Sequence, residues 1–390
     1  MSKMAKLAAL AVKPATTRRK IIPTTVALPR ANSLQDNLDE AIRTLNADRL
    51  LALKADMIGN NVIMSHRVYG HDIAGVESLV IHASPLAVLL EYIKLCPVDM
   101  VSFIPAALTV MVRDWGKDPN ADLKVTEVRR SVNSHLTTMD ITCTAMSWLM
   151  RKRDIDAVHI VNMHCCIATL ITLGAVVSRP FKLTPSDPYT PNGLSLPFVA
   201  IKRIGSLRCA DTLLDGGSRF LPTDPSPMCA AMRDFIAEDA VTFFHRNWIA
   251  GMLTTDDVLK METSGSTAMH IFIADPMQTE AEAAVRILNM MLEMGFKPST
   301  ERGDGTTALA YAESRAMSSR TTPTKQAVFE HLRALQLDHD RQMAVAVLHS
   351  MKALPKDMIG NIWERLSYGV SMDQANAAVR RVKLMKRAAV

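Results

Sequence analysis

One pattern occurs twice in the second half of the chain, and internal repetition of this kind limits the possible folds more than composition does. The first copy reads GSTAMHIFIA at Gly265–Ala274, and the second reads GTTALAYA at Gly305–Ala312. Between them lies VRILNMMLEMG at Val285–Gly295, an apolar stretch with helical periodicity that ends on glycine. The pattern predicts units that consist of a turn, a short helix and a second helix.

Weaker copies of the pattern become visible once this register is known. We count six helix-turn-helix units, with the similarity weakest toward the middle of the chain. The further copies are DIAGVESLVIHA at Asp72–Ala83, TAMS at Thr144 with ATLITLGAVV at Ala168–Val177, the stretch Asn192–Phe220, and SPMCAAM at Ser226–Met232.

These copies resemble the ankyrin repeat, in which the turn D-x-x-G-x-T-P-L-H-x-A opens one helix and a second helix ends in L-L-x-x-G-A. The resemblance implies an all-α solenoid of irregular units over residues 61–335. Ala268 and Ala308 stand where the family has proline, and the units start at uneven intervals. Insertions over residues 113–138, 182–191 and 238–261 are therefore expected to bulge from the array or to add helices.

The residues of the pattern have physical roles that the structure can test. Glycine permits the positive φ of the turn, and the threonine hydroxyl caps the first helix. We expect Gly217 and Gly295 to end second helices in the left-handed conformation.

Three further segments flank the predicted array. Residues 1–31 contain three prolines among threonine and arginine and indicate a flexible or partner-ordered arm. Residues 32–60 carry apolar positions at helical spacing and predict one capping helix. Residues 336–390 predict a C-terminal helical segment.

The composition favours a helical protein that resides in a reducing compartment. The chain is 48% hydrophobic but only 5% aromatic, and it contains 25 methionines, a balance that favours helices over sheets. Six cysteines without regular spacing suit free thiols. The longest nearly uncharged apolar run, Cys165–Val177, is shorter than the about 20 residues that a bilayer requires. We expect a cytoplasmic protein without a membrane segment.

The positive charge is concentrated at the two ends of the chain. Residues 1–30 carry a net charge of +7 and residues 367–390 one of +4, which leaves about −5 for the body. Nucleic acid is therefore expected to bind only through the tails and without specificity, since no aromatic residue precedes Tyr69. The basic tail residues singled out are Arg18, Arg19, Lys20, Arg380, Arg381 and Lys383.

Three clusters could carry chemistry, and each is better explained by helix packing. His159, His164, Cys165 and Cys166 do not have the spacing of convergent metal ligands. The stretch Asp215–Ser218 falls where a second helix must end. No acid or nucleophile lies at recognisable spacing from His245. We expect no enzymatic activity, no cofactor and no metal.

The stretch LPKDMIGNIWERL at Leu354–Leu366 resembles the opening of an F-box, the element that docks on the adaptor of a cullin ubiquitin ligase. A capping helix of the array would need the same apolar stripe, so both interpretations stay open. The residues that carry the resemblance are Leu354, Pro355, Met358, Ile359, Ile362 and Leu366.

The function predicted from the sequence is protein–protein interaction, because a repeat array exposes a long surface suited to recognition. A viral, phage or effector protein fits this description. The alternatives are a substrate adaptor of a ubiquitin ligase and a structural component of a larger particle. We expect a protein partner, with contacts at the turn tips Arg219, Lys297, Glu301 and Arg302.

Overall fold

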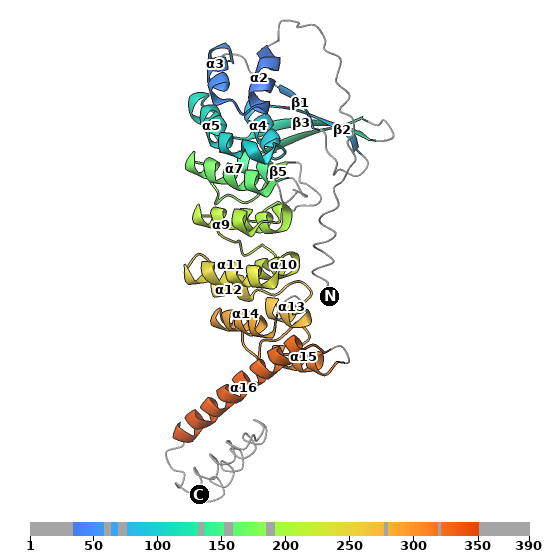
Figure 1. The fold of residues 1–390 in the computed structure, drawn as a ribbon, viewed down its shortest axis with the longest axis vertical. Coiled ribbons are helices and arrows are strands. Elements are labelled where there is room, and N and C mark those ends of the chain that lie inside the picture. Colours follow the sequence, from blue (N-terminus) through green and yellow to red (C-terminus); the bar gives the residue numbers. More distant parts are fainter. Residues whose placement is uncertain are drawn as a thin grey trace, which may run out of the picture.

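The computed structural model shows an elongated molecule in which pairs of helices lie in successive layers (Figure 1). It describes residues 34–57, 64–68, 76–131, 136–151, 159–184, 192–276, 280–318 and 321–350. The described part of the chain is mostly helical, as predicted. None of its helices is long and apolar enough to cross a membrane.

Each layer contains a first and a second helix. The first helices are α4 (Pro85–Ile93), α6 (Ala145–Leu149), α8 (Leu196–Val199), α10 (Pro227–Asp234), α13 (Ala268–Ala274) and α15 (Ala308–Ala316). The second helices are α5 (Ile104–Thr109), α7 (Ile160–Thr172), α9 (Leu207–Asp215), α11 (Ala237–Ile249), α14 (Ala281–Glu293) and α16 (Pro323–Ser350).

Contacts between layers follow the order of the chain. Helix α7 packs on α5 and α9, α11 packs on α9 and α14, and α14 packs on α16. On the other side of the layers, α10 packs on α13 and α13 on α15. Short helical segments complete several layers: η1 (Val98–Phe103), η2 (Val110–Asp114), η4 (Ala200–Ile204) and α12 (Thr255–Leu259).

A serine or threonine precedes each of these six first helices. In five of them the hydroxyl accepts a hydrogen bond from the backbone N–H three residues on, and such a cap is worth about 1 kcal/mol. In the sixth, Thr267 Oγ1 instead bonds His270 Nδ1 at 2.7 Å. The capping residues are Ser84, Thr144, Ser195, Ser226, Thr267 and Thr307.

The helix-ending glycines have the predicted conformation. Gly217, after α9, has a φ of 93°, and Gly295, after α14, has a φ of 107°. Both values lie in the left-handed region, where a residue with a Cβ is strained.

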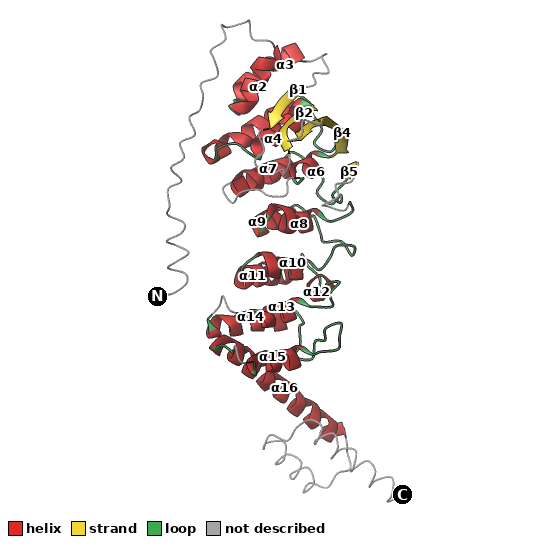
Figure 2. Cartoon of the chain, turned by 90° about the vertical axis from the view of Figure 1, so that its right-hand side faces the viewer, coloured by secondary structure: helices red, strands yellow, loops and turns green. Residues whose placement is uncertain are grey.

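A five-stranded antiparallel sheet lies beside the first layers (Figure 2). Its order is β1 (Met64–Val68), β2 (Val76–Ala83), β3 (Leu123–Ser131), β4 (Leu136–Cys143) and β5 (Leu183–Thr184). Strand β2 leads directly into α4 and β4 leads into α6, so the sheet is built from the connections between layers. Its register pairs Val125 with Ile141, and both side chains are buried.

This sheet means that the all-α prediction is only partly confirmed: most of the described chain is helical, but it also contains strands. The insertion over residues 113–138 supplies β3 and the start of β4 instead of a bulge or extra helices. Within β3, Leu123, Val125 and Glu127 are buried while Lys124 is exposed, an alternation with the period of a strand. The composition of the whole chain favours helices, and this average concealed the alternating, β-branched sequence of β3.

Two other predicted boundaries also differ from the structure. The stretch read as the start of the first unit contains strand β2, and the unit opens instead at Ser84. The predicted single capping helix is two helices, α2 (Leu34–Arg43) and α3 (Ala47–Met57), because the chain turns at Leu45, which has a φ of 46°. Helix α16 is continuous across residue 335, where we expected the array to end.

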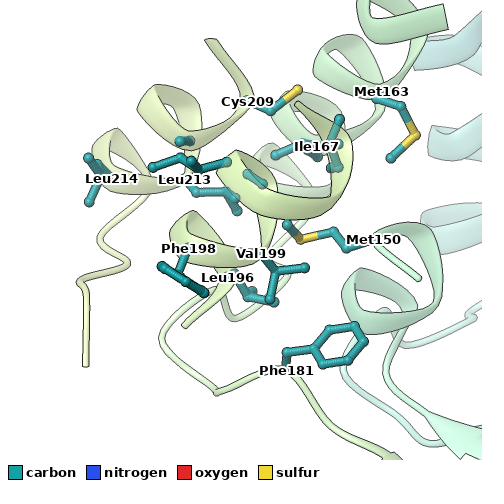
Figure 3. Packing of buried hydrophobic residues seen from close by; sticks show 14 of the residues in the cluster. Met150, Met163, Ile167, Phe181, Leu196, Phe198, Val199, Cys209, Leu213 and Leu214 are labelled. Carbon is teal, nitrogen blue, oxygen red and sulfur yellow. The ribbon is translucent and has the colours of Figure 1, made fainter. Parts of the chain in front are cut away.

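The core runs through the layers as one apolar cluster (Figure 3). Met150, Met163 and Phe181 belong to it, and Leu196 and Leu213 continue it into the next layer. Methionine, with an unbranched side chain, suits gaps between layers whose helices differ in length.

Candidate functional site

A groove of about 660 Å³ lies between α9 and α11. It crosses from one layer to the next, so neither layer could form it alone. Its lining residues are Gly205, Ser206, Leu207, Arg208, Asp211, Phe235, Glu238, Asp239, Thr242, Phe243 and Arg246.

The groove has an apolar floor and a charged rim. Phe243 is buried, and Phe235 and Leu207 are half-buried. The exposed rim carries charged side chains: Arg208 from α9, and Glu238, Asp239 and Arg246 from α11. An apolar side chain could lie on this floor while polar groups beside it met the rim.

Local sequence explains how the rim is built. Gly205 ends η4 with a φ of 67°, which turns the chain sharply into α9. Ser206 then caps α9 by accepting from the N–H of Cys209 at 3.1 Å. Glu238 and Asp239 occupy the first turn of α11, where the helix dipole favours acids.

Asp211 connects the two walls of the groove. Its Oδ1 accepts from Arg246 Nη2 at 2.5 Å and from Asn247 Nδ2 at 3.0 Å. These bonds fix α9 against α11 along the groove, so its width is set by the packing of two layers.

The four predicted contact residues fall on two separate loops. Lys297, Glu301 and Arg302 share the loop between α14 and α15, whereas Arg219 lies between α9 and α10. Arg219 bends back so that Nη1 donates to the carbonyls of Leu214 at 3.0 Å and Ser218 at 2.6 Å. Lys297 and Glu301 are exposed, whereas the Arg302 guanidinium lies over the ring of Tyr311. Their role in binding stays a prediction.

The histidine and cysteine cluster does not form a metal site in the described part of the chain. No group of three or more metal-capable side chains comes together there. Cys166 is buried in α7, and Cys165 and His164 are half-buried. Burial lowers the pKa of His164 and raises that of Cys166.

Asp215–Ser218 forms the end of α9, as the packing interpretation requires. Helix α9 ends at Asp215, and Ser218 Oγ donates to the carbonyl of Val177 at 2.8 Å. The stretch therefore ties one layer to the one before it.

His245 has an acidic neighbour that sequence spacing did not reveal. Its Nε2 lies 2.6 Å from Glu293 Oε2 of α14, and its ring stacks near Trp248. The two residues are far apart in sequence and meet only because α11 and α14 are adjacent. The pair joins two layers on the second-helix side.

A buried charged cluster beside the sheet also escaped the sequence reasoning. Lys94 is 2% exposed, and its Nζ donates to Glu91 Oε2 at 2.7 Å and to the carbonyl of Trp148 at 2.8 Å. Burial lowers the pKa of Lys94, and the pairing with Glu91 opposes that change. Glu127 of β3 forms an ion pair with Arg151, whose guanidinium lies over the Trp148 ring.

This cluster connects α4, α6 and the sheet and is enclosed by them. Because its charges are paired with one another, we assign it a structural role. The one feature of the sequence that could have indicated this cluster is Glu127, an acid on the same face of β3 as the buried Leu123 and Val125.

The F-box-like stretch and the basic tail residues lie outside the described residues. Their roles remain predictions from the sequence alone.

No protein-family model matches the chain, and no curated protein matches it. The assignment of a function therefore depends on the chain's own residues.

Proposed function

We propose that the chain is an ankyrin-like repeat protein that binds a protein partner. The described residues form six layers, and in each of them a serine or threonine precedes the first helix. This shared feature supports a repeat origin, although the helices differ in length. Layers of this kind stabilise one another through their shared core and leave helix surfaces and loop tips for recognition.

The observation that carries this proposal is the groove between α9 and α11. Its apolar floor with a charged rim has the composition of a protein–protein interface, in which a few buried anchors supply most of the binding energy. The charged side chains around it also pair with one another, as Asp211 does with Arg246. This arrangement suits an apolar partner residue flanked by polar groups better than a small charged metabolite.

Blocking the groove tests the proposal. Thr242 is exposed on the groove wall, and Thr242→Arg would place a long charged side chain over the floor. We expect this change to reduce recovery of the partner by at least about tenfold, or about 1.4 kcal/mol of binding free energy. The measurement is affinity purification of the tagged chain from its native setting, with quantitative mass spectrometry of the proteins that co-elute.

A matched control separates the groove from the surface in general. Thr172 is exposed on α7 and lies outside the groove, so Thr172→Arg adds the same charge elsewhere. Recovery with Thr172→Arg should equal that of the unchanged chain. Equal losses for both variants, or no loss for either, would contradict a groove-based partner site.

A further inference from the structure

Tyr311 in α15 has two arginines beside its ring. The guanidinium carbon of Arg302 lies 5.3 Å from the centre of the Tyr311 ring, and that of Arg315 lies 4.9 Å away. Arg315 Nη2 also donates to the tyrosine hydroxyl at 2.5 Å. The imidazole of His270, from the preceding layer, packs on the same ring at 5.8 Å.

These two cations are short of anionic partners within the described residues. The carboxylate nearest to Arg302 is that of Asp304, at 3.9 Å, and Arg315 has no carboxylate within ion-pair distance among them. The Nε atoms of both arginines are enclosed without a hydrogen-bond acceptor in the same part of the chain. Two arginines held beside one ring with so few acceptors favour an incoming anion.

The arginines are held in position before any ligand binds. The Arg302 backbone N–H donates to the carbonyl of Thr306 at 2.9 Å, and the N–H of Gly303 donates to that of Gly265 at 2.8 Å. Arg315 belongs to α15 itself, one turn after Tyr311. Such preorganisation lowers the entropic cost of binding an anion.

The surrounding acids indicate which anion fits. Glu301 and Glu313 are exposed nearby in sequence, and the Asp304 side chain is 57% exposed. A nucleic-acid backbone would bring several phosphates close to these carboxylates, whereas one carboxylate side chain would not. The local charge thus favours a single carboxylate.

We propose that Arg302, Tyr311 and Arg315 form a carboxylate-binding site for an aspartate or glutamate side chain of the protein partner. The site rests on the proposed function, because it assigns part of that partner's chemistry. It also gives Arg302, predicted from the sequence as a contact residue, a defined ligand class.

Selective labelling gives a readout confined to this site. The chain has only five tyrosines, so ¹³C-labelled tyrosine in the full chain gives few ring signals, and Tyr311→Phe identifies that of Tyr311. The probe is a synthetic peptide with one glutamate flanked by glycines and with blocked ends, so that it carries a single carboxylate, titrated at constant ionic strength. We expect the Tyr311 signal to shift and saturate, and Arg302→Gln with Arg315→Gln to weaken this response by at least about tenfold.

The control is Arg286→Gln, which removes one exposed arginine of α14 away from the site. It should leave the Tyr311 response within about twofold of the original. The inference fails if the Tyr311 signal does not move, if the double variant responds like the control, or if the same peptide with phosphoserine in place of glutamate shifts the signal at tenfold lower concentration.

Co-purification separates this inference from the proposed function. If the native partner binds the original chain and the double variant equally, the repeat-binding function stands and the carboxylate site is wrong. If Tyr311 responds to the single-glutamate peptide but no partner co-elutes, the site stands and the proposed function fails.

Discussion

Individual buried thiols show how strongly the layers exclude water. Burial raises the pKa of Cys143 and of Cys229 to about 12, and that of Cys209 to about 11. All six cysteines are free, and five of them are buried. The residues behave as small apolar side chains, as the sequence predicted from their positions in apolar stretches.

These thiols predict a loss of stability at alkaline pH. Because an unfolded cysteine ionises near pH 8.5 and the folded thiols of Cys143 and Cys229 stay protonated up to about pH 12, their stabilising contribution is complete below pH 8.5 and decreases as the pH rises above it. Cys143→Ala with Cys229→Ala should therefore reduce the loss of unfolding free energy by up to about 2.7 kcal/mol per pH unit. Urea unfolding in reductant from pH 8 to 10.5 measures the two slopes.

The single variant Cys165→Ala is the control, since this thiol is half-buried and should change the slope less. Identical slopes for the original chain and the double variant would mean that the two thiols are exposed to solvent.

Whole helices could be predicted from the sequence where the serine or threonine before the first helix and the glycine after the second helix recur at regular spacing. Between Asn192 and Ala312 the sequence predicted most of the first and second helices that the structure has. The exception is residues 238–261, which were expected to be an insertion and instead contain most of α11, the second helix of its layer, and α12. The prediction failed at β2, where the ending His82-Ala83 imitates the unit pattern although the real cap, Ser84, comes next. Sequence alone could not reveal the groove, since it needs the distance between α9 and α11.

The contact between the turn before α13, which contains Gly265, and the turn before α15, which contains Gly303, gives an element-scale test of the layer contact. A Cβ on Gly265 would lie 2.8 Å from the Gly303 Cα, and this backbone cannot rotate away. Gly305 has a similar positive φ, but a Cβ added there would meet nothing within 4 Å. We therefore expect Gly265→Ala to cost at least about 2 kcal/mol, and Gly305→Ala only the about 1 kcal/mol of backbone strain.

Chemical denaturation of the two variants measures this difference. Equal costs would show that the two turns do not touch and that the last layers are spaced differently.

At the scale of the whole molecule, the layers combine three kinds of surface. The sheet lies beside the first layers, and the groove lies between α9 and α11. The Tyr311 site belongs to α15, the first helix of the last described layer. The separation of these three surfaces along the molecule is set by the number of layers between them.

Hydrogen–deuterium exchange of the chain with and without its co-purified partner tests the central claim most directly. The account predicts slower exchange on binding over residues 205–211 and 235–246, which form the groove, and unchanged exchange in α7 on the far side of α9. Protection confined to the sheet, or no change at the groove when the partner is bound, would contradict it.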